Sequence, residues 1–293
     1  MKKSEAKTNI FGRGLAAKHS NSSTQPSNGI SIYMYLKSSD GEQTLIVNEF
    51  GRTYDAEELC YMAVEKLGIS PLVAPLFALA YPLLESWCPP NEQIICSAEC
   101  AHEFILRIRF IPPESVISKL SRDERITFNY LFQQIRDDFI NDYIVFTKSI
   151  GQEHLLGLGV IDMVRYGKEQ GINLSGLRNL EPQDFIPASA KNKFKFFFDK
   201  KRLHMNFKPH LQKEYEQYEN DTVVNIQLTY IKSIAVYSEQ RYGVETFRIT
   251  PETLVEVTPF DTKFPGLNIR EGKVMQSGCH FTCVAYLLCV QYY

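Results

Sequence analysis

The first third of the chain alternates apolar and polar positions in short runs, a pattern typical of half-buried strands. In the run ISIYMYL, the side chains of Ile30, Ile32, Met34 and Leu36 fall on one side. Further strands are expected in TLIVNEF, LFALAY, PNEQIIC and FILRIRF, the last with arginines at alternate positions. These runs predict a sheet that has one face in a hydrophobic core.

Between these strands, the segment DAEELCYMAVEKLG has apolar residues on one helical face. Asp55 is expected to cap its first turn, with Glu58 three residues later completing a capping box. Gly68 is expected to end the helix in a left-handed conformation. A hairpin, a helix and more strands follow the order of a ubiquitin-like lobe. We place this lobe at residues 30–112, because two successive prolines cannot continue a central strand.

After the prolines the apolar spacing becomes helical. It is clearest in TFNYLFQQIRDDFI and again between Leu155 and Val164. The stretch IPPESVISKLSRDERITF is expected to be a short link. A last helix is expected from about Ile226 to Tyr242, ending at Gly243. We therefore predict an all-helical lobe at residues 120–243.

Composition limits the setting and the partners. The 293 residues carry a net charge of −2, which argues against a surface built throughout for nucleic acid. Residues 1–29 lack the apolar run of a secretory signal and are expected to be a disordered leader. Seven cysteines, an odd number without regular pairing, fit a reducing compartment. Cys96, Cys100 and His102 lack the spacing of a zinc site, so we expect no metal.

No catalytic motif is found in the sequence. A kinase needs a Gly-rich phosphate loop, a strand lysine and two functional aspartates, and none of these is recognisable. The string GLGVIDM lies inside a helical pattern, where close helix packing explains it better than phosphate binding. His154, Asp162 and Cys60 fall on separate elements and do not form a nucleophile motif. We expect no enzyme activity, catalytic residue or cofactor in this chain.

One local feature does suggest a binding site. Residues 191–213 hold eight basic residues against one acid, a net +7, so the rest of the chain, whose total is −2, carries −9. We call this stretch the basic segment. Such a segment attracts an acidic peptide or an anionic leaflet, and interleaved phenylalanines could line an apolar groove beside it. The alternative is a solvated lysine face over a phenylalanine core, and Pro209 is expected to kink or restart the helix. The candidate binding residues are Lys193, Lys195, Phe197, Phe198, Lys200, Lys201, Arg202, Phe207 and Lys208.

Several strings carry a family resemblance. YLFQQIRDDF behind a ubiquitin-like lobe, and RYGVETFRI after the last helix, resemble the FERM family. Within it, YDAEELC, GISPLVAPLFAL, SWCPPN, LRIRF, HLLGLGVIDMVRYGKEQG and NLEPQDFIP are similar to Janus kinases, in the order that family shows. The resemblance covers roughly residues 30–250. It implies an α+β fold with a ubiquitin-like β-grasp lobe, an acyl-CoA-binding-protein-like helical lobe and a PH-like third lobe.

The chain departs from that family at its end. Residues 244–293 are too few for a whole third lobe, so we expect a partial start of it with an atypical tail. The final stretch VMQSGCHFTCVAYLLCVQYY lacks charged side chains, yet its polar residues make it a poor membrane span. We expect a truncated or alternatively spliced end, before the SH2 and kinase domains of a full-length form.

The resemblance also implies partners. In Janus kinases the helical lobe receives the proline-rich, membrane-proximal segment of a cytokine receptor, which lies below an anionic membrane surface. We therefore expect a cytoplasmic chain, peripheral at the inner face of the plasma membrane or an endomembrane, that binds a receptor juxtamembrane peptide. A FERM membrane–cytoskeleton linker that binds phosphoinositides is the alternative. Nucleic-acid binding through the lysine and phenylalanine stretch is not expected.

Overall fold

The computed structural model describes residues 28–82, 87–144, 152–193 and 197–236, and five short strands beyond them. For residue 152, residues 191–193 and 197–206, and the short strands, it describes the backbone only. The chain divides into two compact units, Met1–Gln240 and Arg241–Tyr293. Each unit is described by itself below.

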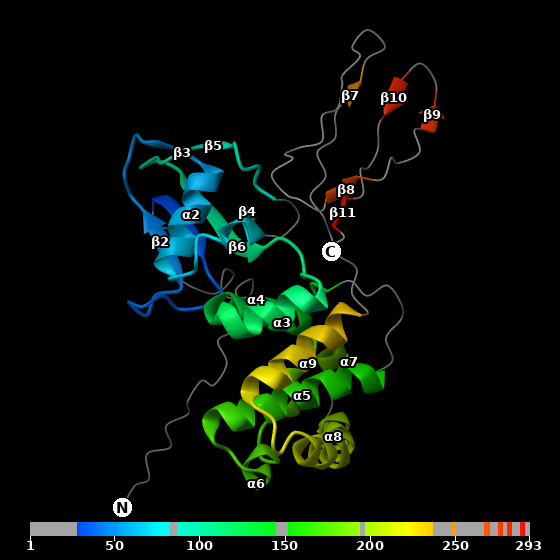
Figure 1. Ribbon diagram of the computed structural model, residues 1–293. Helices are drawn as coiled ribbons and strands as arrows, with labels where there is room; N and C mark the ends of the chain where they lie inside the picture. Colours follow the sequence, from blue (N-terminus) through cyan, green and yellow to red (C-terminus); the bar gives the residue numbers. More distant parts are fainter. Residues whose placement is uncertain are drawn as a thin grey trace, which may run out of the picture. The chain divides into compact units, whose positions relative to one another are not determined.

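The ubiquitin-like lobe is built on a mixed sheet in the order β2-β1-β6-β4 (Figure 1). Its strands are β1 (Gly29–Tyr33), β2 (Thr44–Val47), β4 (Phe77–Ala80) and β6 (Ala101–Ile108). β1 runs parallel to β6, whereas β1 with β2 and β4 with β6 are antiparallel. A second pair, β3 (Thr53–Asp55) with β5 (Gln93–Ile95), is also antiparallel, and the 3-10 turn η1 (Ala74–Leu76) precedes β4. A central parallel pair flanked by antiparallel strands is the predicted β-grasp arrangement.

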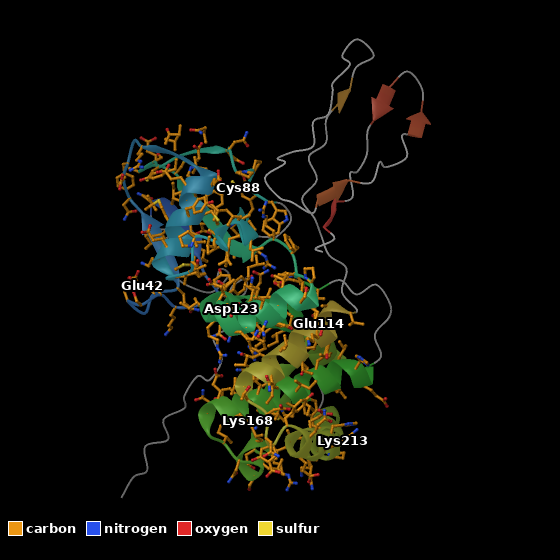
Figure 2. The ribbon with its side chains drawn as sticks, in the orientation of Figure 1. Glu42, Cys88, Glu114, Asp123, Lys168 and Lys213 are labelled. Carbon is orange, nitrogen blue, oxygen red and sulfur yellow. The ribbon has the colours of Figure 1, made fainter. Side chains whose placement is uncertain are left out.

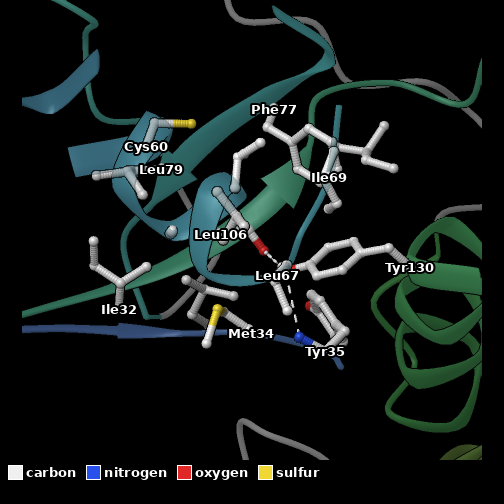
Figure 3. Close-up of a cluster of buried hydrophobic side chains, with 14 of the residues drawn as sticks. Ile32, Met34, Tyr35, Cys60, Leu67, Ile69, Phe77, Leu79, Leu106 and Tyr130 are labelled. Carbon is white, nitrogen blue, oxygen red and sulfur yellow. Dashed lines mark hydrogen bonds between the residues drawn. The ribbon is translucent and has the colours of Figure 1, made fainter. Parts of the chain in front are cut away.

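The predicted alternation places the core of this lobe. Ile30, Ile32 and Met34 are fully buried, and helix α2 (Ala56–Lys66) contributes Leu59 and Ala63 to the same core. Figure 3 shows Ile32 and Met34 among the buried side chains of this cluster. Such burial is the main favourable contribution to folding.

The helix α2 ends as predicted but does not begin with the predicted capping box. Gly68 has a φ of +71°, the left-handed stop. Asp55 is the N-cap residue, but its side chain makes no capping hydrogen bond. Its carboxylate accepts instead from the amide of Gln93, directly opposite on β5, and Glu58 accepts from Arg52 at 2.7 Å. The capping prediction was wrong because the Asp55 carboxylate accepts from Gln93 on the neighbouring strand instead of from the backbone N–H groups of the helix.

The helical lobe surrounds one central helix. Its elements are α3 (Glu114–Asp123), α4 (Arg125–Ile140), α5 (Gln152–Gln170), α6 (Leu174–Leu177), η2 (Pro182–Phe185), α7 (Ala188–Lys193), α8 (Phe197–Gln217) and α9 (Val223–Ala235). Helix α5 contacts α6, η2, α8 and α9, and its residues 158–167 are buried or nearly so. The apolar spacing predicted for α4 is confirmed by its buried residues, which include Phe128, Phe132 and Phe139.

Two details of the helical lobe differ from the predictions, and a third prediction falls partly outside the described residues. The expected link after the prolines contains helix α3, which buries Ile117 and Leu120. Glu114 at the start of α3, labelled in Figure 2, pairs with Lys232 of α9 at 2.6 Å. Helix α9 spans Val223–Ala235, and the predicted end at Gly243 lies outside the described residues. Helix α8 runs through Pro209 as one element, so a restart there is wrong.

The second unit contains short strands. β7 (Arg248–Ile249), β10 (His280–Thr282) and β9 (Met275–Ser277) form a sheet in the order β7-β10-β9, and β11 (Leu288–Val290) pairs with β8 (Leu267–Ile269). β7 lies in the stretch VETFRI, for which an extended backbone was predicted. No helix within the described residues is long and apolar enough to cross a membrane.

Candidate functional site

The basic segment is helical wherever the structure describes it. It begins within α7 and continues along α8, and residues 194–196 between them lie outside the described residues. Lys195 is therefore not placed. Only the backbone is described for Lys193, Phe197, Phe198, Lys200, Lys201 and Arg202. Their contacts with a ligand stay a prediction.

The second half of α8 has a core face and a solvent face. Phe207 and Leu211 are both 2% exposed and Tyr218 is also buried, in a core cluster shared with α5. Lys208 and Lys213 are exposed; Figure 2 labels Lys213 on this helix. This half of α8 thus matches the alternative of a lysine face over an aromatic core. Phe207 belongs to that core, and we leave it out of the docking surface proposed below.

The GLGVIDM string serves helix packing, as predicted. A Cβ added at Gly159 would lie 2.8 Å from the carbonyl oxygen of Phe185 and 2.9 Å from Cγ2 of Ile186. It would also lie 3.3 Å from the ring of Phe207. At Gly157 a Cβ would meet nothing within 4 Å. Gly159 is therefore the residue that lets α5 approach η2 and α8.

A buried ion network joins α4 to α5. Asp162 accepts from Nε of Arg136 at 2.6 Å and from Nε of Arg165 at 2.7 Å, and Arg165 also pairs with Glu169 at 2.6 Å. Burial by itself raises the pKa of the Asp162 carboxyl, but the two guanidinium groups outweigh it and hold the pKa below its usual value. The guanidinium of Arg165 also lies 4.9 Å from the ring centre of Phe132. These contacts join α4 to α5 inside the helical lobe.

Helix α4 is bonded to the sheet through its tyrosine. The hydroxyl of Tyr130 donates to the carbonyl of Leu106 at 2.7 Å and accepts from the amide of Tyr35 at 3.3 Å. Figure 3 shows this ring reaching from α4 to the ends of two strands, with both hydrogen bonds drawn. The Tyr130 ring also meets Tyr35 and Phe77 edge-on. A fully buried hydroxyl with both partners satisfied fixes how α4 packs on the sheet.

Two further polar residues, on the next two turns of α4, also bond this helix to strand β6. The side-chain amide of Gln134 accepts from the backbone N–H of Ile108 at 2.8 Å and donates to the carbonyl of Ile108 at 3.0 Å. Asp138 receives two hydrogen bonds from Arg107, and Arg107 also donates to the hydroxyl of Tyr35. The polar residues that face the sheet therefore follow one stripe along α4.

Comparisons with known proteins agree with this two-lobe arrangement. The model of the FERM F1 ubiquitin-like domain matches residues 30–119, and that of the FERM F2 acyl-CoA binding protein-like domain matches residues 123–237. The chain belongs to the FERM family. As a FERM module it is a non-catalytic domain. We call the two lobes F1 and F2 from here on.

Relatives of known name match within the FERM region. The tyrosine-protein kinase JAK1 of Danio rerio is 24% identical over 262 residues, covering 77% of this chain and 22% of that protein. The tyrosine-protein kinase JAK3 of Rattus norvegicus is 27% identical over 130 residues, covering 40% of this chain and 12% of that protein. The chain thus spans about a fifth or less of these relatives. It is similar to the FERM region of Janus kinases.

A solved structure supports the fold. The MyTH4-FERM MF2 domain of Dictyostelium discoideum myosin VII superposes with a TM-score of 0.52 at 13% identity. The superposition covers 78% of this chain and 44% of the myosin chain. At this identity the likeness concerns the FERM fold and carries no function across.

Sequence reasoning missed the residues that join F1 to F2. Tyr130, Gln134 and Asp138 are four residues apart on α4, so they lie on one helical face. Within an amphipathic helix, three polar residues at this spacing mark a second, polar contact surface. The spacing of these three polar residues could have been noticed in the sequence. Their partners in F1 could not have been predicted, because they depend on how the strands pack onto α4.

Two of the residues considered for nucleophilic chemistry, His154 and Asp162, lie on the same helix α5, so the prediction of separate elements was wrong for them, whereas Cys60 lies on α2. Asp162 belongs to the ion network of F2, whereas Cys60 lies in the core of F1. Burial raises the pKa of the Cys60 thiol to about 12, so it is protonated at neutral pH and is a poor nucleophile. His154 is exposed on α5.

The cysteines considered for a metal differ in burial. Cys96 is fully buried, and its thiol donates to the carbonyl of Val47 at 3.3 Å, whereas Cys100 is exposed. No group of three or more His, Cys, Asp or Glu residues in the described part of the chain could hold a metal ion.

A shallow hollow lies at the end of α5, and it offers little to an anion. Its one lysine, Lys168 (Figure 2), donates to the carbonyls of Glu219 and Asp221 at 2.8 and 2.7 Å. The ammonium group therefore secures the turn between α8 and α9. The hollow, of about 260 Å³, is lined by Gly167, Lys168, Gly171, Ile172, Asn173, Tyr215 and Glu219.

Proposed function

We propose that this FERM module docks the membrane-proximal segment of a cytokine receptor and thereby anchors a Janus-type tyrosine kinase at the receptor. The basic segment on α7 and α8 of F2 carries the proposal, because it concentrates a net +7 on one part of a chain that is otherwise acidic. The similarity to the FERM regions of JAK1 and JAK3 supports it.

The positive charge of the basic segment also suggests where the module acts. A receptor tail emerges just below an anionic leaflet, where each basic residue near the surface contributes roughly 1 kcal/mol of attraction. We therefore propose a cytoplasmic module, peripheral at the inner face of the plasma membrane or an endomembrane. Lys200, Lys201 and Arg202 supply the attraction, and Phe197 and Phe198 contact the apolar residues of the peptide. Lys208, exposed on the same helix, extends the cationic surface.

Signalling would then be a matter of effective concentration. A module that holds a kinase on a receptor tail raises the local concentration of that kinase when two receptors pair. In a full-length form the partners within the chain would be SH2 and kinase domains. The present chain contributes only the binding step.

The decisive experiment reverses three charges in the full 293-residue chain. Replacing Lys200, Lys201 and Arg202 by glutamate should weaken binding to anionic vesicles on the order of 100-fold. It should also weaken binding to a receptor juxtamembrane peptide and flatten the dependence of that binding on salt. Unchanged affinity and unchanged salt dependence would falsify the assignment.

A matched control has the same change in net charge elsewhere. Lys37, Arg122 and Arg125 are exposed and lie outside the basic segment. Their replacement by glutamate should leave peptide affinity close to that of the unaltered chain. Circular dichroism of both variants checks that the fold is kept. A strong preference for phosphoinositide vesicles over the receptor peptide would favour the linker alternative instead.

A further inference from the structure

The start of α7 is held to the end of α4 by an aspartate in an unusual conformation. Asp142 follows the last residues of α4 with a φ of +61°, the left-handed region that favours glycine. The amide of Asp142 donates to the carbonyl of Phe139 at 3.3 Å, and the amide of Tyr143 donates to the carbonyl of Asp138 at 2.8 Å. This left-handed turn ends the helix, and glycine would form it with less strain.

The side chain of Asp142 explains why glycine is absent. Its carboxylate accepts two hydrogen bonds from Ser189, one from the backbone N–H at 2.6 Å and one from the hydroxyl at 2.6 Å. Ser189 is the second residue of α7 and lies 47 positions away in the chain. Both residues are exposed. We call this pair of hydrogen bonds the clasp.

The clasp sits next to the basic segment. Lys191 begins that segment two residues after Ser189, on the same helix. Within the described residues, the clasp is therefore a polar contact that ties the start of the basic segment to α4. Helix α4 in turn is bonded to F1 through Arg107 and Asp138.

We propose that Ser189 is a phosphorylation site and that its phosphate opens the clasp. The hydroxyl is exposed, and the backbone before it is extended at Ile186. Helix α7, of six residues, is short enough to open locally. Lys191 and Lys193 follow at the second and fourth positions, and the first acid after Ser189 is Asp199. This charge pattern suits a serine/threonine kinase whose acidic pockets select basic residues.

The chemistry removes one hydrogen bond of the clasp directly. With Mg-ATP as donor, Oγ of Ser189 forms a bond to the γ-phosphorus, the bond from that phosphorus to the β-phosphate oxygen breaks, and ADP leaves. The hydroxyl proton passes to the catalytic carboxylate of the kinase. The esterified oxygen then has no hydrogen to donate to Asp142.

The second hydrogen bond is lost to repulsion. The new phosphate carries about −1.5 to −2 charges at neutral pH, and it is attached where Oγ lies 2.6 Å from a carboxylate oxygen of Asp142. Two like charges at that separation move apart, and the backbone N–H of Ser189 moves with them. The start of the basic segment is released from α4, and receptor docking weakens. This last consequence rests on the proposed function.

The test compares two phosphoserine positions in the full chain. Phosphoserine is placed genetically at Ser189 or at Ser175, and hydrogen exchange of residues 188–193 is followed by mass spectrometry. Ser175 is the matched control, since it is also exposed and also the second residue of a short helix of F2. Phosphate at Ser189 should speed exchange about tenfold, the loss expected for hydrogen bonds to a charged group. Phosphate at Ser175 should leave these residues unchanged.

The variant Asp142→Asn separates repulsion at the clasp from a general effect of charge. Asparagine tolerates the left-handed conformation and cannot repel a phosphate. In this variant phosphate at Ser189 should speed exchange much less, because the hydroxyl hydrogen bond is still lost but the repulsion is absent. Two results would overturn the inference. Either phosphate at Ser189 leaves the exchange rate unchanged, or it speeds exchange equally with Asp and with Asn at position 142. A panel of basic-directed kinases with Mg-ATP that leaves Ser189 unmodified overturns the site assignment.

Receptor-peptide affinity is measured on the same samples and reports separately on the proposed function. If phosphate speeds exchange of α7 while charge reversal at Lys200, Lys201 and Arg202 leaves peptide affinity unchanged, the clasp stands and receptor docking fails. If charge reversal weakens binding and phosphate leaves α7 closed, docking stands and the clasp proposal fails.

Discussion

Arg107 on β6 of F1 and Asp138 on α4 of F2 form a buried ion pair with two hydrogen bonds. Nη2 lies 2.5 Å from Oδ2 and Nη1 lies 3.0 Å from Oδ1, and the two side chains are 11% and 12% exposed. A paired, planar geometry of this kind is what makes burial of both charges tolerable. The pair therefore couples the packing of F1 to that of F2.

Breaking this pair from one side should be costly. In Arg107→Met the Asp138 carboxylate stays buried without its partner, and the free energy of unfolding should fall by about 3 kcal/mol. Urea denaturation of the full chain measures the loss. The double variant Arg107→Met/Asp138→Leu should recover much of it, because both buried charges are then gone. A control, Arg52→Met, removes ion pairs that lie in solvent and should change stability far less. Equal losses for the two arginines would contradict this account.

Stability should respond to pH through Asp137. Burial first, and the neighbouring Asp138 next, raise the pKa of the Asp137 carboxyl from 3.8 to about 6 in the folded chain. The folded state thus favours the protonated form. The stabilisation from the protonated Asp137 carboxyl is therefore fully present below about pH 4 and is lost as the pH rises through 6.

The variant Asp137→Asn isolates that contribution. At pH 7 it should be more stable than the unaltered chain by about 2 kcal/mol, and the difference should shrink toward pH 4. Urea denaturation at several pH values between 4 and 7 measures it. A difference that does not depend on pH in this window would contradict the raised pKa.

Two glycines of α5 should respond to alanine with opposite signs. Gly159→Ala places a Cβ 2.8 Å from the backbone oxygen of Phe185 and should destabilise F2 by about 1 to 3 kcal/mol. Gly157→Ala meets nothing within 4 Å and should stabilise the helix by about 0.5 to 1 kcal/mol. Thermal unfolding of the two variants gives both signs. Destabilisation of the same size at both positions would show that the close approach of α5 to η2 is incorrect.

The cysteines of F1 should differ in reactivity. Burial raises the pKa of the thiols of Cys60 and Cys88 to about 12, so little thiolate forms near neutral pH. Cys100 is exposed. Brief treatment with iodoacetamide at pH 7.5 should modify Cys100 well before Cys60 or Cys88, as read by mass spectrometry. Adding denaturant should bring the rates together, and fast labelling of Cys60 in the folded chain would argue against its place in the core.

The sequence predicted the elements of F1 and F2 where apolar residues repeat regularly. The alternation from Ile30 to Met34 and the helical spacing from Phe128 to Phe139 both correspond to buried faces. A buried face needs only local periodicity, because a strand or a helix presents side chains at a constant spacing. The resemblance to FERM proteins added the order of the lobes, which the family comparisons confirm.

Polar partners were less predictable. Asp55 had the spacing for a capping box, yet the structure gives its carboxylate to Gln93 on another strand. The basic segment was recognised from its composition. The clasp that holds its start, between Asp142 and Ser189, was not recognised, since 47 residues separate the two.

The sequence by itself determined which faces are apolar, where the charge concentrates and which family the chain resembles. Only the tertiary structure decided which polar groups meet, as at Arg107 with Asp138 and at Asp142 with Ser189. The physical reason is range. Hydrophobic burial is non-directional and follows from periodicity along one element, whereas a hydrogen bond or ion pair needs two groups within about 3 Å and in the right orientation. Chain folding brings such groups together from distant positions.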